Sequence, residues 1–295
     1  MATPPTRAPS GPSEGARVER PVLDLGKYLV VVKGGGDLGT GVAYRLFRAG
    51  FAVAVLERAQ PLAIRRRVAF AQAVYDGATT VEGVTARRVE TPEEALALLT
   101  RREVPVLVDE RGESLPALRP IALVDATLCK RSPSTRIGDA PFVVGLGPGF
   151  EVGVHAHAVV ETQRGHHLGR VLWEGHAAPD TGEPGEIGGQ TARRVLRAPA
   201  AGRFRACREI GARVREGEIV AYVDDHPIRA PFDGVLRGLL AEGLVVPKGM
   251  KVGDVDPRGA VEHCFTISDK ALAVGGGVLE ALCAYLSGQA GGPRG

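Results

Sequence analysis

The feature that most constrains this chain is a glycine-rich turn between an apolar run and a helix-like segment. Tyr28 to Val32 is apolar and β-branched, and Leu38 to Ala49 follows the turn with helical character. Within the turn, Gly34, Gly36 and Gly39 have the spacing G-x-G-x-x-G. Such glycines let a phosphate group approach the backbone at a helix N-terminus, where unpaired amides and the helix dipole favour an anion. The turn therefore predicts a nucleotide-binding loop of Rossmann type.

A second apolar run, Phe51 to Leu56, ends at Glu57, where an acidic side chain can accept hydrogen bonds from ribose hydroxyls. A structural glycine turn beside a surface glutamate is the alternative, and Asp37 counts against phosphate through charge repulsion. We predict that the ligand-binding residues of this first loop and strand are Gly34, Gly35, Gly36, Asp37, Gly39 and Glu57.

Further short apolar runs predict buried strands at 104–108, 121–125, 142–146 and 158–161. The connections between most of these runs are long enough for crossovers, and 92–102 is predicted as a helix with Thr91 as its N-cap. The expected fold class is α/β, with a Rossmann-like, mostly parallel sheet first.

After about Leu196 the sequence repeats itself with an offset of 32 residues, as in Ala198-Pro199 and Ala230-Pro231. Two such halves predict a β-rich barrel-sandwich domain like that of biotinyl and lipoyl carriers. The position of a carrier lysine reads Asp224-Asp225-His226-Pro227, so neither biotin nor lipoate is expected. The ten identities are Ala198/Ala230, Pro199/Pro231, Gly202/Gly234, Arg205/Arg237, Gly211/Gly243, Val214/Val246, Gly217/Gly249, Val220/Val252, Val223/Val255 and Asp224/Asp256.

The length of 295 residues fits about two domains. Ser268 to about Leu286 has a leucine stripe typical of a helix, in which three successive glycines either separate two short helices or allow close packing. The predicted organisation is a disordered leader at 1–25, a Rossmann-like domain at 26–196, a barrel-sandwich-like domain at 197–262, a C-terminal helical segment at 263–288 and a disordered tail at 289–295.

Composition excludes several classes of function. The 37 basic and 34 acidic residues leave a formal charge of +3, which gives no electrostatic argument for nucleic acid. No apolar run reaches the roughly 18 residues expected of a membrane span. The four cysteines form no Cys-x-x-Cys pair, and the N-terminus lacks a signal-peptide core, so we expect a cytoplasmic protein with free thiols.

Other candidate site residues follow the later strands. Gly147 and Gly149 follow the run 142–146 and offer either a second ligand loop or a plain turn, and Arg164 is a candidate clamp for an anion. His155 and His157 share one face and, with Glu161 and His166, have polar groups for a metal, but the spacing matches no familiar site and we predict none. Cys129 beside Lys130 and Arg131 is a weaker candidate nucleophile.

The order of these segments resembles the YqeB-type family of accessory proteins, assigned to the maturation of selenium-dependent molybdenum hydroxylases. Its Rossmann part is similar to that of XdhC-type maturation proteins. The resemblance covers about Tyr28 to Leu286. The matching motifs are Lys33-Gly34-Gly35-Gly36-Asp37-Leu38-Gly39-Thr40-Gly41, Glu57-Arg58-Ala59-Gln60-Pro61 with Arg65-Arg66, Gly145-Leu146-Gly147-Pro148-Gly149-Phe150, Glu161-Thr162-Gln163-Arg164-Gly165-His166 and Lys251-Val252-Gly253-Asp254-Val255-Asp256-Pro257-Arg258.

The resemblance implies a maturation protein that holds a nucleotide-containing ligand, either the molybdenum cofactor or NAD(P), and meets a molybdenum hydroxylase client. It transfers no catalytic residue, so whether the chain catalyses a reaction stays open. In this interpretation Arg65, Arg66 or Arg164 contacts anionic groups of the ligand. One alternative is an NAD(P)-dependent oxidoreductase with His157 or His166 as proton donor, and another is a non-catalytic interaction scaffold.

Overall fold

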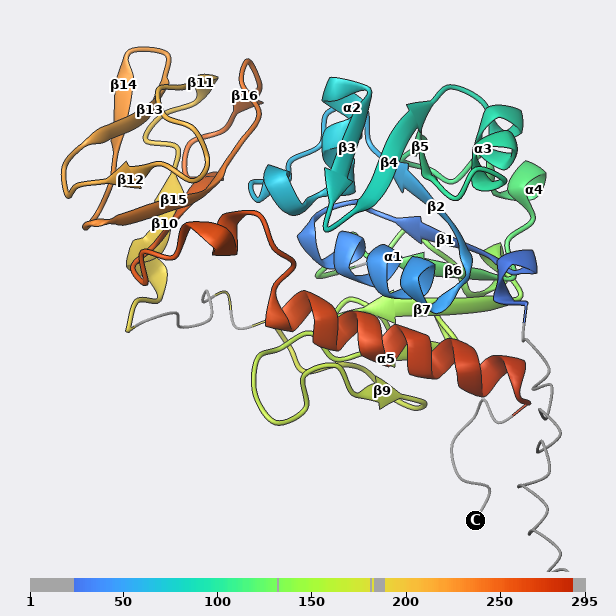
Figure 1. The fold of residues 1–295 in the computed structure, drawn as a ribbon. Coiled ribbons are helices and arrows are strands. Elements are labelled where there is room, and N and C mark those ends of the chain that lie inside the picture. The colour runs from blue at the N-terminus through green and yellow to red at the C-terminus, as the bar shows by residue number, and fades with distance from the viewer. Residues whose placement is uncertain (1–23, 132, 181, 183–188, 289–295) are drawn as a thin grey trace, which may run out of the picture.

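The computed structural model describes residues 24–131, 133–180, 182 and 189–288 (Figure 1). The segments 1–23 and 289–295, which include most of the predicted leader and the whole predicted tail, lie outside the described residues. The described chain forms two units. We call them the sheet unit, which contains a nine-stranded sheet, and the repeat unit, which contains the two halves of the 32-residue repeat.

The sheet unit is built on one mixed sheet with the strand order β3-β4-β5-β2-β1-β6-β7-β8-β9. From β4 to β8 in this order, each strand runs parallel to the next. The edge strands β3 and β9 run antiparallel to β4 and β8. Its strands are β1 (Leu29–Lys33), β2 (Ala52–Glu57), β3 (Ala78–Val81), β4 (Val84–Val89), β5 (Val104–Val108), β6 (Ala122–Asp125), β7 (Phe142–Leu146), β8 (Ala158–Val160) and β9 (Val171–Leu172).

Helices cover both faces of this sheet. Val30, Val32 and Val55 pack with α1 and α5 on one face, while Val31 and Leu56 pack with α3 and α4 on the other. The helices are α1 (Asp37–Ala49), α2 (Ala73–Asp76), α3 (Pro92–Leu99), α4 (Leu115–Leu118) and α5 (Asp269–Leu286), with short 3₁₀ turns η1 (Leu25–Lys27), η2 (Arg66–Val68), η3 (Phe70–Gln72), η4 (Ile137–Asp139), η5 (Ala192–Arg194) and η6 (Val261–Cys264).

Helix α5 belongs to the core of the sheet unit although it follows the repeat unit in the chain. It lies along α1 in Figure 1, and Val274 and Val278 join the apolar core of the sheet. The three glycines do not break it, and two of them permit close packing. A Cβ atom on Gly275 would lie 2.7 Å from the carbonyl oxygen of Gly41 in α1, and one on Gly277 would lie 2.1 Å from that of Gly169.

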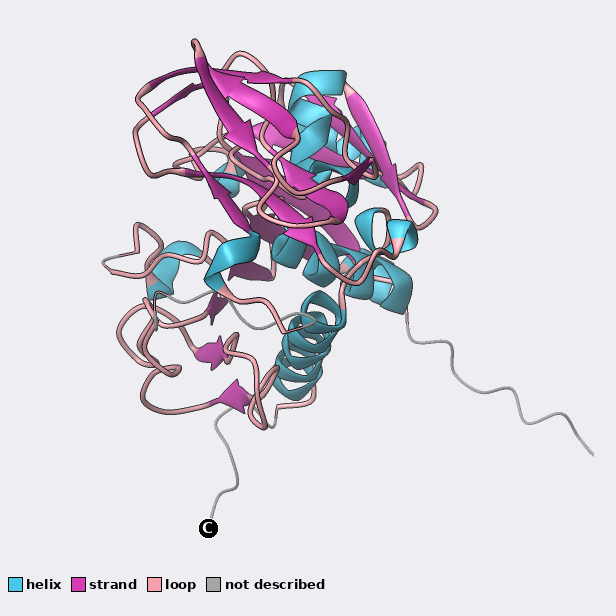
Figure 2. Cartoon of the chain, turned by 90° about the vertical axis from the view of Figure 1, so that its left-hand side faces the viewer, coloured by secondary structure: helices cyan, strands magenta, loops and turns pink. Residues whose placement is uncertain are grey.

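The repeat unit consists of two four-stranded antiparallel sheets, with orders β10-β17-β15-β12 and β14-β13-β11-β16. The strands of this unit lie on the side of the molecule that faces the viewer in Figure 2. They are β10 (Val195–Arg197), β11 (Gly202–Ala206), β12 (Arg213–Val214), β13 (Ile219–Val223), β14 (His226–Arg229), β15 (Gly234–Leu239), β16 (Val245–Val246) and β17 (Lys251–Asp256).

The two halves of the repeat exchange strands. β12 of the first half pairs with β15 of the second, and β11 of the first pairs with β16 of the second. Each sheet therefore takes strands from both halves. Two hydrogen bonds join the repeat unit to the sheet unit. The amide of Leu239 donates to the carbonyl of Ile64 at 2.7 Å, and the side-chain Nε of Arg66 donates to the carbonyl of Leu239 at 2.8 Å.

The predicted fold class is wrong. A Rossmann-like sheet followed by a single barrel-sandwich domain was expected, but the chain forms one large mixed sheet and two separate antiparallel sheets. One reason is a tight hairpin at Glu82-Gly83, both with positive φ, which turns β3 back along β4. Another is the strand exchange between repeats, with β10 and β14 added at the edges of the two sheets.

Candidate anion-binding cavity

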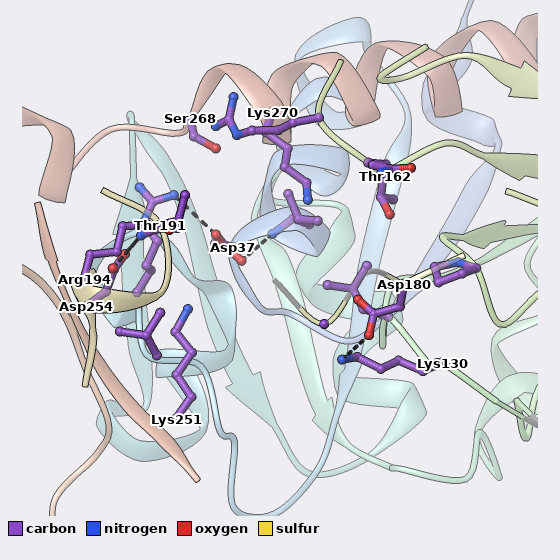
Figure 3. Close-up of a pocket in the computed structure, with 18 of the residues that line it drawn as sticks. Asp37, Lys130, Thr162, Asp180, Thr191, Arg194, Lys251, Asp254, Ser268 and Lys270 are labelled. Carbon is purple, nitrogen blue, oxygen red and sulfur yellow. Dashed lines mark hydrogen bonds and ion pairs between the residues drawn. The ribbon is translucent and has the colours of Figure 1, made fainter. Parts of the chain in front are cut away.

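A cavity of about 730 Å³ lies between the sheet unit and the repeat unit (Figure 3). On one side it is lined by residues that follow the carboxyl ends of β1, β6, β7 and β8, such as Asp37, Lys130, Pro148 and Thr162. On the other side it is lined by β10, β15 and β17. The strand order reverses at β1, whose neighbours are β2 and β6, and ligands of open α/β sheets bind at the carboxyl edge beside such a point.

The lining of this cavity is strongly basic. Among the described residues that line it, eight are cationic and three are acidic. Buried surfaces of one dominant sign attract ligands of the opposite sign. The cationic residues are Arg65, Lys130, Arg164, Arg194, Arg197, Arg237, Lys251 and Lys270, and the acidic residues are Asp37, Asp180 and Asp254. We refer to this space as the cationic cavity.

Carboxylates hold several of the arginines in place. Arg164 makes a bidentate ion pair with Asp269, with nitrogen-oxygen distances of 2.7 and 2.9 Å. This pair and its hydrogen bonds hold the pKa of Asp269 below its ordinary value. Arg194 Nη1 lies 2.7 Å from one carboxylate oxygen of buried Asp254. These arginines are therefore fixed in orientation by the protein itself.

Arg65 and Arg237 form a second, more deeply buried group. Arg65 Nη1 lies 3.3 Å from a carboxylate oxygen of Asp37, and its Nε has no hydrogen-bond partner among the described residues. Arg237 Nη1 lies 3.5 Å from Asp256. Burial, followed by the nearby charge of Arg65, lowers the pKa of Arg237 to about 10. Two buried arginines therefore lie close enough for the charge of one to affect the other.

Lys251 and Lys270 differ from the other cations of the cavity. Within the part of the chain that the structure describes, neither ammonium group has a hydrogen bond or an ion pair. Desolvation lowers the pKa of both lysines. The charge of Asp254, and then that of Asp37, opposes the shift of Lys251, and the charge of Asp37 opposes that of Lys270. Figure 3 shows the two side chains reaching the cavity from opposite sides of Asp37. Their hydrogen-bond donors are available to a ligand.

The predicted glycine loop lies at the border of the cavity. Gly36 is the N-cap of α1, and a Cβ atom on it would meet no atom within 4 Å. Gly39 has no such space, because a Cβ atom there would lie 1.9 Å from the carbonyl oxygen of Gly34. Asp37, in the first turn of α1, lines the cavity. The structure thus leaves room for a ligand beside Gly36 and uses Gly39 for packing.

Glu57 does not line the cavity. Its carboxylate accepts hydrogen bonds from the backbone amides of Gly35 and Arg58, both at 2.8 Å. Burial raises the pKa of Glu57, while these two amides act in the opposite direction. In this structure Glu57 orders the glycine loop, and its predicted contact with a ribose stays a prediction.

The second predicted loop borders the cavity through Pro148. A Cβ atom on Gly149 would lie 2.2 Å from the carbonyl oxygen of Cys129, and one on Gly147 would lie 2.9 Å from the hydroxyl of Thr162. These glycines therefore allow the loops after β6, β7 and β8 to pack closely. Arg66, unlike Arg65, contacts the repeat unit rather than the cavity.

The histidines and Cys129 lie outside the cavity lining. His157 precedes β8, at the opposite edge of the sheet, and its Nδ1 accepts a hydrogen bond from the amide of Val143. His155 accepts one from the amide of Glu151, and the Cys129 thiol donates to the carbonyl of Arg131. In the described residues no three His, Cys, Asp or Glu side chains are placed to hold a metal ion.

Most of the cationic lining was not predicted from the sequence, including Arg194, Arg197, Arg237, Lys251 and Lys270. These residues come from β10, β15, β17, α5 and the turn before β10, far from the glycine loop in the chain. A signal was present in the repeat itself, where Lys251 replaces Ile219 of the first half. A charge at a position that is apolar in the other half marks a residue that the fold does not require.

No family model matches the chain. A relative described as "Uncharacterized protein YqeB", from Escherichia coli (strain K12), is 50% identical over 268 residues, which cover 91% of this chain and 50% of the relative. The chain is similar to YqeB. It spans about half the length of that relative, and the similarity supports the resemblance to YqeB-type proteins without bearing on molybdenum hydroxylases.

Solved structures give weaker similarity. An aspartoacylase family protein from Mesorhizobium loti matches with 12% identity and a TM-score of 0.23, over 77% of this chain and 84% of its own. A succinylglutamate desuccinylase/aspartoacylase from Rhodobacter sphaeroides matches with 16% identity and a TM-score of 0.24, over 77% and 85%. At these values the likeness carries no argument about the chemistry of this chain.

None of the helices in the described ranges has the length and apolar character that crossing a bilayer requires.

Proposed function

We propose that this chain binds a phosphate-bearing, nucleotide-type ligand in the cationic cavity and acts as a cytoplasmic accessory protein in the maturation of a selenium-dependent molybdenum hydroxylase. The observation that supports ligand binding is the lining of the cavity, with eight cationic and three acidic side chains at the carboxyl edge of the parallel strands. The pathway rests on the resemblance to YqeB-type proteins.

The size and position of the cavity suit such a ligand. Small-molecule sites commonly enclose about 300–1,000 Å³, and the cationic cavity has about 730 Å³. It adjoins the N-terminus of α1, where Gly36 leaves open space and the helix dipole favours an anion. The molybdenum cofactor in its dinucleotide form and NAD(P) both carry phosphate groups of the kind that this lining favours.

The oxidoreductase alternative needs a proton donor near the ligand. His157 lies at the opposite edge of the sheet and His166 is exposed outside the cavity lining. No described histidine lines the cavity. The geometry therefore favours a protein that binds and presents its ligand over one that transfers hydride with histidine as the acid.

The test is to purify the protein from a host that makes molybdenum cofactor and to identify co-purifying ligands by mass spectrometry. Gly36→Asp places a carboxylate beside the expected phosphate, and Gly36→Asn is its neutral control. Both residues are good N-caps, and the extended backbone of Gly36 suits them, so we expect both variants to fold.

A pterin or pterin dinucleotide that is present in the parent and the Asn variant but lost in the Asp variant supports the proposal. NAD(P) with the same pattern supports the oxidoreductase instead. Absence of any nucleotide-type ligand from all three preparations contradicts ligand binding and favours the alternative of a non-catalytic interaction scaffold. Co-purification of a molybdenum hydroxylase subunit with the parent tests the client separately.

A further inference from the structure

We propose that Lys251 and Lys270 together form a subsite for a diphosphate-type group, which binds between the two units of the protein. This inference rests on the proposed function, because it specifies which part of a phosphate-bearing ligand the cavity recognises. It also makes the repeat unit part of the binding site.

The two lysines come from different units. Lys251 is the first residue of β17 in the repeat unit, and Lys270 lies in the first turn of α5, which packs on the sheet unit. The charge of Asp37 acts to raise the pKa of both lysines, and Asp37 lies between them in Figure 3. A single anion seated beside Asp37 is therefore within the field of both ammonium groups.

Asp37 does not neutralise this pair of lysines. One of its carboxylate oxygens accepts a hydrogen bond from the amide of Leu38 at 3.0 Å, and the other is paired with Arg65 at 3.3 Å. Other carboxylates also act on the two lysines: Asp254 on Lys251, and Glu161 and Asp269 on Lys270. Asp254 and Asp269 are themselves paired with Arg194 and Arg164, so the positive excess around Asp37 comes from Arg65, Lys251 and Lys270. The local excess favours a ligand group with at least two negative charges.

Other cations of the cavity already have partners. Lys130 Nζ lies 2.6 Å from Asp180, Arg164 is paired with Asp269, and Arg197 Nη1 donates to the carbonyl of Gly249 at 3.0 Å. Lys251 and Lys270 are the lysines of the lining without such a partner among the described residues. Each ammonium offers three rotatable donors, which suits phosphate oxygens.

A diphosphate fits better than a single phosphate or a carboxylate, because its oxygens are spread over two phosphorus centres and can accept from donors on both sides of the cavity. Arg65 and Arg237, both nine-tenths buried, add positive potential behind the same space. Inorganic pyrophosphate is the smallest probe that carries this group without a nucleoside.

The experiment measures binding of pyrophosphate and of inorganic phosphate to the full chain by titration calorimetry at fixed ionic strength. The variants are Lys251→Met and Lys270→Met. Lys248→Met is the matched control, because Lys248 is exposed, lies three residues before Lys251 and does not line the cavity. Melting temperatures of all variants verify that they are folded.

We expect pyrophosphate to bind more tightly than phosphate, and each cavity variant to weaken pyrophosphate binding by about tenfold or more, as for the loss of a charged hydrogen bond. Lys248→Met keeps the parent affinity. Lys251→Arg, which retains the charge, restores part of the affinity lost in Lys251→Met. A merely structural lysine would change the melting temperature without this pattern.

Undetectable pyrophosphate binding, or equal weakening by all three methionine variants, overturns the inference. These outcomes are separable from failure of the proposed function. A nucleotide that co-purifies but whose retention is unchanged in both cavity variants contradicts the lysine subsite alone. Pyrophosphate binding through the two lysines, with no nucleotide-type ligand in any preparation, supports the subsite and contradicts the nucleotide assignment.

Discussion

The two halves of the repeat have the same strands but different surroundings. Strands β11, β12 and β13 of the first half correspond to β15, β16 and β17 of the second, shifted by 32 residues. In the first half, Arg205 lies over the ring of Tyr222 with its guanidinium carbon 4.8 Å from the ring centroid. In the second half, the equivalent Arg237 is buried beside the cavity.

The residues that differ between the halves are informative about function. Ile219 and Tyr222 of the first half become Lys251 and Asp254, which line the cavity. The valines that the halves share, such as Val223 and Val255, lie in the common apolar core. The shared valines therefore belong to the strand framework, whereas Lys251 and Asp254 are changes from the first half that add polar groups to the cavity.

The largest expected difference between the halves concerns their equivalent aspartates. Asp256 is buried and accepts hydrogen bonds from Arg258 while facing Arg237, whereas Asp224 is exposed and accepts one from the amide of Arg203. Because Asp256→Ala leaves a buried arginine uncompensated, we expect a loss of about 3–5 kcal/mol in the free energy of unfolding. Asp224→Ala should cost about 0.5–1.5 kcal/mol. Urea unfolding measures the loss in each variant. Equal losses would show that the two aspartates do not differ in their contribution to stability.

The next effect concerns the equivalent arginines. Arg237→Met removes a cation from the cavity wall and leaves Asp256 paired with Arg258, so we expect the fold to survive and pyrophosphate affinity to fall by about tenfold. Arg205→Met removes only a surface contact with Tyr222 and should leave affinity unchanged. Calorimetric titration measures the pyrophosphate affinity of both variants. An Arg237→Met variant that binds as tightly as the parent would contradict a role of Arg237 in binding.

A smaller effect is expected when the halves are made alike at Lys251. Lys251→Ile, which copies Ile219, removes an unpaired charge and should raise the free energy of unfolding by less than about 1 kcal/mol after solvent screening. The pKa of Lys251 is lowered, so the folded state disfavours its charged form. The difference in free energy of unfolding between Lys251→Ile and the parent should therefore shrink as pH rises toward the ordinary lysine pKa of 10.5. A variant less stable than the parent at neutral pH would contradict this view.

The smallest effect is a pH dependence of Asp256. Hydrogen bonds and charge from Arg258 hold the pKa of Asp256 below its ordinary value of 3.8, against the opposing effect of burial. Its contribution to stability is present above pH 3.8 and is lost as pH falls below that value. Unfolding curves between pH 5 and 2 should therefore show a steeper loss for the parent than for Asp256→Asn. Parallel curves would show that Asp256 has no such coupling.

The sequence predicted the central strands because each is an apolar run buried on both faces, as for 104–108 and 142–146, which become β5 and β7. Thr91 and Ser268 cap α3 and α5 as expected. Strand β3 at the edge of the sheet and its neighbour β4 were missed because Thr79, Thr80 and two arginines replace an apolar pattern. The fold class failed at these edges and in the pairing between repeats, which depend on contacts between distant segments.

The candidate site was predictable only in part. The glycine loop was recognised from its G-x-G-x-x-G spacing, although Gly39 serves close backbone packing in the structure. The lysines of the cavity carry no local signature, since Lys251 in a strand and Lys270 in a helix each read as surface residues. Their role emerges when folding brings the two units together around Asp37. Differences within the repeat would have identified Lys251 from the sequence.

The return of the chain from the repeat unit to α5 has a practical consequence for dissecting the protein. A fragment that ends at Asp256 would expose the face of the sheet that Val274 and Val278 cover in the whole chain. Such a fragment lacks a helix of its core and is prone to aggregate. The sheet unit is therefore best produced as a two-piece system, in which a separate peptide spanning residues 268–288 complements the truncated chain.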